Sequence, residues 1–337
     1  MKILITGANG FIGSALTRRL HQAGHDVRVL IRPGADRQLL AGLPLAPADQ
    51  ALAGQIAVFE GELTRPDSLA APLKSAEAVI HLAGLRRSPS RSELFAVNAD
   101  GTRALCEAAA AHAPQSRFVL CSSLTAVGPS RDFPDEKAPL RPADWYGESK
   151  AEAEAIALSF SDRLSVAIAR PSRIVGPGDR ENLAFFKLVQ KGLRLSIGGG
   201  PRPMSTLDVD DLTLGFQLLA ERRGPSGETF FLSRDTTTME ALMDEIARQM
   251  DRRTVRLPIP APVLRVLASG ADAATRLTGR RLPLNRKLSQ QLLAPGWTCS
   301  IVRARETLGF DPQISLAQSV TRSLHWYREQ GWLPPAA

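Results

Sequence analysis

The stretch Gly7-Ala8-Asn9-Gly10-Phe11-Ile12-Gly13 decides the fold of this chain. Its three glycines have G-x-x-G-x-x-G spacing and come directly after the apolar run 2–6, KILIT. The first glycine allows a tight turn, the second lets the backbone approach a pyrophosphate, and the third lets a helix pack closely on the strand. A helix that begins in such a turn offers free N–H groups and a positive dipole end to phosphates. The expected cofactor contacts in this loop are Gly7, Asn9, Gly10, Phe11, Ile12 and Gly13.

Short β-branched runs alternate with alanine-rich stretches through the first half of the chain. Near-continuous apolar strands that alternate with helices are typical of a parallel sheet covered on both faces. The pattern therefore predicts an α/β fold, a doubly wound parallel sheet of the Rossmann type. The candidate strands are 2–6, 26–32, 56–61, 78–84, 117–123 and 165–171, and the candidate helices are 11–23, 67–74, 91–113 and 145–161.

The pattern changes after Pro171, where Gly/Pro-rich loops interrupt the alternation. We expect a nucleotide-binding domain over residues 1–172 and a smaller, interleaved substrate-binding domain over most of 173–337. Residues 228–250, a strand followed by a capped helix, are expected to return to the first domain. The amphipathic stretch 258–277 has two interpretations, a helix that packs over a pocket, which is the commoner case, or one that faces a membrane.

Composition excludes several classes of protein. The net charge is +8, but the arginines are dispersed and aromatic residues are few, so the charge suits an anionic small molecule better than nucleic acid. No run of 18 apolar residues occurs, so neither a membrane span nor a membrane partner is expected. Cys106, Cys121 and Cys299 form no disulfide or zinc pattern, which indicates a cytoplasmic protein without a metal site.

The pentapeptide Tyr146-Gly147-Glu148-Ser149-Lys150 carries the candidate chemistry. Residues four apart on a helix lie on one face, one turn from each other. An ammonium held beside a phenol favours the phenolate, so Tyr146 is a candidate general acid and base for a hydroxyl or carbonyl oxygen.

The end of the second strand bears on the choice of nicotinamide cofactor. A carboxylate there bonds the ribose hydroxyls of NAD, whereas an arginine accepts the 2′-phosphate of NADP. This strand ends in Arg32. We therefore expect NADP(H) to be favoured, with NAD(H) as the alternative.

Together these blocks resemble the extended short-chain dehydrogenases/reductases, the group that includes the NAD-dependent epimerases/dehydratases. The C-terminal blocks Gly296–Ser300, Ala304–Phe310 and Trp326–Leu333 are similar to those of members such as 3β-hydroxysteroid dehydrogenases and dihydroflavonol reductases. Further matching blocks are Gly61-Glu62-Leu63, His81-Leu82-Ala83-Gly84, Val97–Thr102, Cys121–Gly128 and Arg170–Gly178.

The resemblance implies a role for each matching residue. Ser123 polarises the substrate oxygen, with Ser122 as the alternative if the register shifts by one. Tyr146 exchanges the proton, Lys150 favours its phenolate and bonds the nicotinamide ribose, and Asn98 supports the relay. Further cofactor contacts are Glu62, Leu63, Leu82, Ala83, Gly84 and Pro171, together with Tyr146 and Lys150.

Departures from the family pattern favour one reaction. Dehydratases carry an Asp-Glu pair after the serine, and this chain has Leu124 and Thr125 there. Arg173 and Met204 stand where sugar-nucleotide enzymes bind a diphosphate. These four are the candidate substrate contacts.

We therefore expect hydride exchange with a ketone or secondary alcohol. A nucleotide-sugar epimerase and a non-catalytic nucleotide-binding subunit remain as alternatives. The resemblance also implies a homodimer through helices over 103–113 and 151–158.

Overall fold

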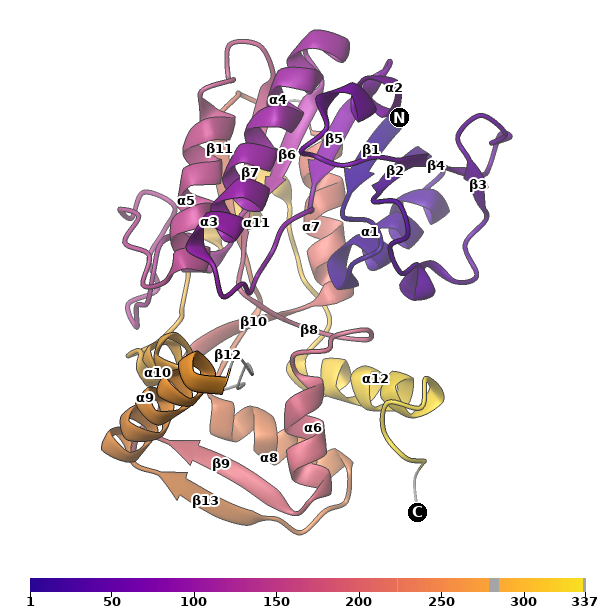
Figure 1. Ribbon diagram of the computed structural model, residues 1–337. Helices are drawn as coiled ribbons and strands as arrows, with labels where there is room; N and C mark the ends of the chain where they lie inside the picture. Colours follow the sequence, from indigo (N-terminus) through magenta and orange to yellow (C-terminus); the bar gives the residue numbers. More distant parts are fainter. Residues whose placement is uncertain (223, 279–284, 336–337) are drawn as a thin grey trace.

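The computed structural model describes residues 1–222, 224–278 and 285–335. Its largest element is an eight-stranded sheet in the order β11-β7-β6-β5-β1-β2-β4-β3, and every neighbouring pair of strands is parallel. The predicted doubly wound parallel sheet is confirmed (Figure 1). Its strands are β1 (Lys2–Thr6), β2 (Asp26–Ile31), β3 (Leu45–Pro47), β4 (Ile56–Glu60), β5 (Ala78–His81), β6 (Arg117–Cys121), β7 (Ser165–Pro171) and β11 (Glu228–Leu232).

Helices cover both faces of this sheet because alternate side chains of each strand point to opposite faces. Ile3 and Ile5 of β1 join one buried cluster with helices α1 (Phe11–Gln22) and α7 (Val209–Glu221). Leu4, between them, joins a second cluster with α2 (Ala70–Leu73), α4 (Gly101–His112) and α5 (Trp145–Leu158).

The expected single helix 91–113 is divided in the structure. It comprises α3 (Arg91–Phe95), a π-turn over Ala96–Asp100 and α4. A π-turn adds one residue to the turn and changes the direction of the side chains within it. Asn98 lies in this turn, and its side chain bonds both backbone groups of Leu85, at 2.7 and 2.8 Å.

A smaller part of the chain packs below the large sheet (Figure 1). Its core contains Phe186, Leu242, Met243 and Tyr327. Two small sheets belong to it, β12-β10-β8 and β13-β9. Its strands are β8 (Arg173–Val175), β9 (Leu193–Ile197), β10 (Met204–Asp208), β12 (Asp235–Thr237) and β13 (Val255–Ile259), and its helices are α6 (Leu183–Gln190), α8 (Met239–Gln249), α9 (Ala261–Thr278), α10 (Arg286–Leu293) and α12 (Leu316–Glu329).

The two parts are interleaved differently from the expectation. Strand β11 does return to the large sheet, where it pairs with β7. Helix α8 does not, because its buried residues Leu242, Met243 and Ile246 pack in the smaller core with Phe186. Conversely, α7 and α11 (Val302–Leu308) pack on the large sheet although they lie beyond residue 172. The boundary at 172 stays a prediction.

Candidate active site

The glycine loop has the geometry that a pyrophosphate requires. Gly7 has a positive φ of 72°, and a Cβ on it would lie 2.7 Å from the backbone nitrogen of Ala83. A Cβ on Gly13 would overlap the Gly7 carbonyl. Helix α1 begins after Gly10 without a side-chain cap or an acidic residue in its first turn. Its first N–H groups therefore lack a side-chain acceptor, and the loop fits a dinucleotide phosphate.

The adenosine end of this site is bordered by the loop after β2. Arg32 is exposed there, and Arg37 forms a 2.7 Å ion pair with Glu60 at the end of β4. Asn9 of the glycine loop donates a 2.9 Å hydrogen bond to the carbonyl of Asp36. This bond ties the glycine loop to the segment that carries Arg32 and Arg37.

The segment after β4 lies against the π-turn. The backbone nitrogen of Glu62 donates to the Ser68 hydroxyl at 3.1 Å. A Cβ on Gly101 would lie 3.1 Å from the side chain of Leu63, so this glycine permits a close approach. Glu62 and Leu63 are thus fixed beside the large sheet.

The end of β5 approaches the helix that carries the predicted catalytic pair. The backbone nitrogens of Leu82 and Ala83 donate to the carbonyl and hydroxyl of Thr6, at 3.2 and 3.3 Å. A Cβ on Gly84 would lie 2.9 Å from Asn98 Oδ1 and 3.4 Å from Lys150 Nζ. Gly84, Asn98 and Lys150 therefore meet at one point.

Helix α5 positions Tyr146 and Lys150. Asp144 caps the helix by accepting a 2.7 Å bond from the Gly147 nitrogen. Lys150 Nζ donates a 2.8 Å bond to the carbonyl of Cys121, at the end of β6. The same Nζ lies 5.9 Å from the centroid of the Tyr146 ring. Lys150 is buried and Tyr146 is partly exposed, so the phenol is the member of the pair that can meet a substrate.

The structure separates the two candidate serines. Ser122 is buried and its hydroxyl bonds Glu154, which forms a 2.7 Å ion pair with Arg170. Ser123 begins the short helix 124–126, and its Oγ accepts bonds from the Thr125 nitrogen and hydroxyl at 3.2 and 2.9 Å. That short helix packs against α5, so Ser123 begins the segment that contacts the helix carrying Tyr146.

The four candidate substrate contacts differ in their surroundings. Leu124 is buried in a cluster with Phe231, and Met204 is buried in the smaller core. Neither offers an exposed surface to a ligand. Thr125 is partly exposed beside Ser123, and Pro171 ends β7 on the neighbouring strand.

Arg173 has protein partners of its own. Its Nε donates a 3.1 Å bond to Asn182 Oδ1, and its guanidinium lies 5.3 Å from the Phe185 ring centroid. Burial, together with the nearby charge of Arg86, lowers the pKa of Arg173. The positive charge of Arg173 is thus partly compensated by other groups of the protein.

His81 is a site neighbour to which the sequence assigned no role. Its ring nitrogens bond the hydroxyls of Thr6 at 2.7 Å and Thr102 at 3.1 Å. Burial, and secondly the charge of Lys150, lower the pKa of His81 to about 3. The ring is therefore neutral and links β1, β5 and α4 through Thr6 and Thr102. The sequence did offer one signal for a role of His81, namely its position in the block His81–Gly84 that matches the family.

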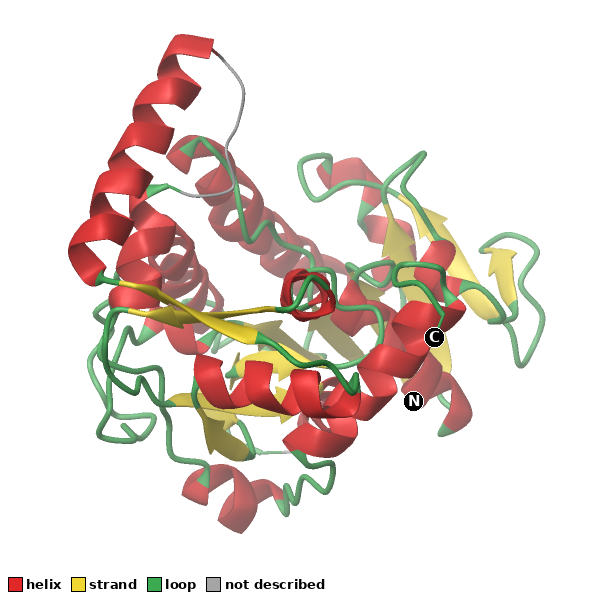
Figure 2. Ribbon diagram, turned by 90° about the horizontal axis from the view of Figure 1, so that it is seen from below, coloured by secondary structure: helices red, strands yellow, loops and turns green. Residues whose placement is uncertain are grey.

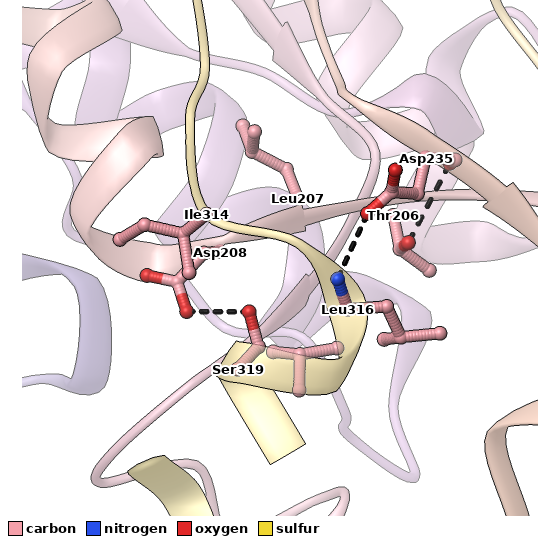
Figure 3. Close-up of a pocket in the computed structure, with 8 residues that line it drawn as sticks. Thr206, Leu207, Asp208, Asp235, Ile314, Leu316 and Ser319 are labelled. Carbon is pink, nitrogen blue, oxygen red and sulfur yellow. Dashed lines mark hydrogen bonds between the residues drawn. The ribbon is translucent and has the colours of Figure 1, made fainter. Parts of the chain in front are cut away.

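One narrow recess lies apart from these residues (Figure 3). It lies between β8, β10 and α12, where Asp208 accepts a 2.6 Å bond from Ser319 and Asp235 accepts one from the Leu316 nitrogen at 2.9 Å. None of the predicted site residues lines this recess.

These features define a dinucleotide-binding protein of the Rossmann type. Residues 3–232 match the NAD dependent epimerase/dehydratase family. The chain belongs to that family, within the extended short-chain dehydrogenases/reductases.

Three similar proteins show the range of its relatives. The chain is 32% identical to ceramide reductase of Caulobacter vibrioides, over 98% of this chain and 96% of that protein. It is 28% identical to the 3 beta-hydroxysteroid dehydrogenase/Delta 5-->4-isomerase of Mycobacterium tuberculosis, over 97% and 90%. The crystal structure of gox2253 superposes with a TM-score of 0.80, at 27% identity over 98% of each chain.

Proposed function

We propose that this protein is an NAD(P)-dependent oxidoreductase that transfers hydride between the nicotinamide and a ketone or secondary alcohol. The observation that carries the proposal is the position of Lys150, which is anchored to the Cys121 carbonyl one turn from Tyr146 and beside Gly84 and Asn98. In the glycine loop, a Cβ at Gly7 or Gly13 would collide with backbone, which fits a cofactor that needs close backbone approach.

Each residue of the site has a distinct task in the proposed reaction. The bound nicotinamide would supply or accept the hydride. Tyr146 gives a proton to the substrate oxygen during reduction and takes it back during oxidation. Ser123 donates a hydrogen bond to the charge that develops on that oxygen. Lys150, held by Cys121, stabilises the phenolate form of Tyr146.

NADP(H) is the proposed cofactor. Arg32 is exposed at the end of β2, and Arg37 lies further along the same loop. The Arg32 guanidinium suits the charge of a 2′-phosphate, whereas Arg37 is ion-paired with Glu60. A higher kcat/KM for NADPH than for NADH, reduced in Arg32→Ala, is the expected outcome. An NADH preference in the unmodified protein would refute this assignment.

The proposed substrate is an apolar, lipid-like ketone or alcohol. Two relatives are named for ceramide and for a steroid, both of which are largely apolar molecules. Arg173, the candidate phosphate contact, already bonds Asn182. This partner weakens the case for a sugar-nucleotide diphosphate.

The buried thiols of Cys106, Cys121 and Cys299 support a reducing, cytoplasmic location.

Net oxidation of NADPH at 340 nm with a panel of long-chain and sterol ketones tests the proposal. An oxidoreductase consumes cofactor in proportion to product. A nucleotide-sugar epimerase, the second candidate because the family includes epimerases, converts its substrate with no net change in absorbance. Cofactor binding without turnover of any ketone, alcohol or nucleotide sugar would support the non-catalytic subunit instead.

A further inference from the structure

Helix α9 carries apolar side chains on a buried side and on an adjoining exposed side. Leu264 and Ala268 are buried. Val263, Val266 and Leu267 are 47%, 71% and 52% exposed. Residues three and four apart share one face of a helix, so these three form a single stripe, which lies about a third of a turn round the helix from Leu264 and Ala268. We call this stripe the outer face of α9.

Such a stripe is unusual on a helix in contact with water alone. A helix at a protein surface normally places polar residues on the side away from the core, and an apolar patch that stays exposed is typical of a site of contact with a protein, a ligand or a membrane. Helix α9 continues from the end of β13 and extends away from the body of the protein (Figure 2). The exposed fractions show that no described element covers its outer face.

The segment around the outer face has a net positive charge. Residues 251–272 contain four arginines, Arg252, Arg253, Arg256 and Arg265, and two aspartates, Asp251 and Asp272. Arg265 is exposed on α9 itself. Arg286, at the start of α10, donates a 3.0 Å bond to Ser269 Oγ and so adds its charge along the same helix.

The positive charge around the outer face of α9 favours one kind of binding partner over another. A second copy of the chain, packed face to face about a two-fold axis, would place the same arginines against one another. An anionic lipid surface instead attracts each arginine while the apolar stripe enters the boundary between head groups and acyl chains. We propose that the outer face of α9 docks the protein on an anionic membrane surface.

The position of α9 connects this surface with the candidate active site. Helix α10 packs on α9, and Gln291 of α10 bonds the side chain of Asp144. Asp144 caps α5 two residues before Tyr146. Docking through α9 therefore places the start of the catalytic helix near the bilayer. In the described ranges no helix is long and apolar enough to cross a membrane, so the contact lies on the surface. This proposal departs from the expectation that the protein has no membrane partner.

Flotation of the full-length protein with lipid vesicles tests the proposal without cofactor or substrate. We expect binding to phosphatidylcholine vesicles that contain 30% phosphatidylglycerol. In Val266→Ser/Leu267→Ser binding falls by about tenfold or more, because two apolar side chains no longer leave water. Arg265→Gln lowers it by about fivefold on the anionic vesicles. The matched control is Leu52→Ser, which removes an apolar side chain that is 73% exposed elsewhere and leaves binding unchanged.

The unmodified protein and the double variant are also compared by thermal unfolding and by mass in solution. Equal Tm values with weaker flotation of the double variant support docking. The proposal is overturned if the unmodified protein does not float with anionic vesicles, or if the double variant floats equally well. It is also overturned if the only effect of the substitutions is to dissociate an oligomer, since the face would then bind a second copy. None of these outcomes depends on hydride transfer, so this proposal and the proposed function fail separately.

Discussion

At the scale of single residues, the groups around Tyr146 decide whether its phenol is suited to proton exchange. Lys150 lies one turn away and is held by a main-chain carbonyl, and Asn98 and Gly84 meet beside its ammonium. A lysine anchored in this way keeps its charge in a fixed place next to the phenol. The position of the charge, rather than the tyrosine alone, makes the pair suitable for proton exchange.

Replacing Tyr146 with Phe removes the proton donor and keeps the ring. We expect kcat to fall by about 100- to 10,000-fold, the usual contribution of a positioned general acid. Cofactor affinity, measured by quenching of protein fluorescence, changes little because the glycine loop is untouched. Full activity in Tyr146→Phe with normal cofactor binding would contradict the mechanism.

The neighbouring serines provide a matched pair of variants. Ser123→Ala is expected to lower kcat by about 100-fold or more, since a hydrogen bond to the developing charge is lost. It also removes the cap of the short helix 124–126, which lowers the free energy of unfolding by about 0.5–2 kcal/mol. Ser122→Ala removes a bond to buried Glu154. It is expected to lower the free energy of unfolding by about 1–3 kcal/mol and to leave kcat nearly unchanged. Steady-state kinetics and urea unfolding of both variants check this, and the opposite pattern would identify Ser122 as the catalytic serine.

At the scale of elements, helix α5 joins the site to the sheet. Tyr146 and Lys150 lie in its first half, and Glu154 in the next turn pairs with Arg170 of β7. Both members of this ion pair are buried. The pair holds α5 against β7, and so also helps to fix the position of Tyr146 and Lys150.

Glu154→Ala leaves the guanidinium of Arg170 buried without its carboxylate. We expect the free energy of unfolding to fall by about 3–5 kcal/mol, measured by urea titration. Glu152→Ala, an exposed position on the same helix, is the control and should change it by less than about 0.5 kcal/mol. Equal effects of the two substitutions would show that the buried pair does not hold α5.

Sequence patterns predicted some elements better than others. Strands β1 and β5 and helix α1 lie close to their expected ranges, because continuous apolar runs and the glycine loop are local signals. The π-turn that divides 91–113 was not predicted, since it depends on the bond between Asn98 and Leu85, which is distant in sequence. The predicted position of α8 was also wrong, because the apolar pattern of a helix does not show in which core the helix is buried.

At the scale of the whole molecule, buried His81 links stability to pH. Its pKa in the folded protein is about 3, below the ordinary value of 6.5. The unfolded chain therefore takes up a proton below pH 6.5 that the folded protein does not bind. The contribution of this ring to stability is complete above pH 6.5 and is lost progressively as the pH falls towards 3.

As the pH falls from about 6 to 3.5, we expect the protonation of His81 in the unfolded chain to lower the free energy of unfolding by about 1.4 kcal/mol for each pH unit. His81→Gln lacks this contribution, so its stability should fall less steeply with acid, as measured by urea unfolding across the range. His112→Gln, at an exposed histidine, is the control and should keep the slope of the unmodified protein. Equal slopes in all three proteins would show that His81 protonates freely in the folded state.

Oligomerisation is the remaining prediction at this scale. Helices α4 and α5 pack side by side on one face of the large sheet, and Ala111 and Ala155 are exposed on them. Small side chains allow a second pair of helices to approach closely. We expect a dimer by mass measurement in solution and a monomer for Ala155→Arg, whereas a monomeric unmodified protein would contradict this arrangement.

The sequence by itself determined the Rossmann class, the glycine loop and the tyrosine–lysine pair, because each rests on residues close together in the chain. Only the tertiary structure showed that Ser122 bonds buried Glu154, that Ser123 caps the short helix 124–126, and that Leu124 and Met204 are buried. These outcomes depend on which side chains become buried together. Burial is set by packing between elements far apart in sequence, which a local pattern does not specify.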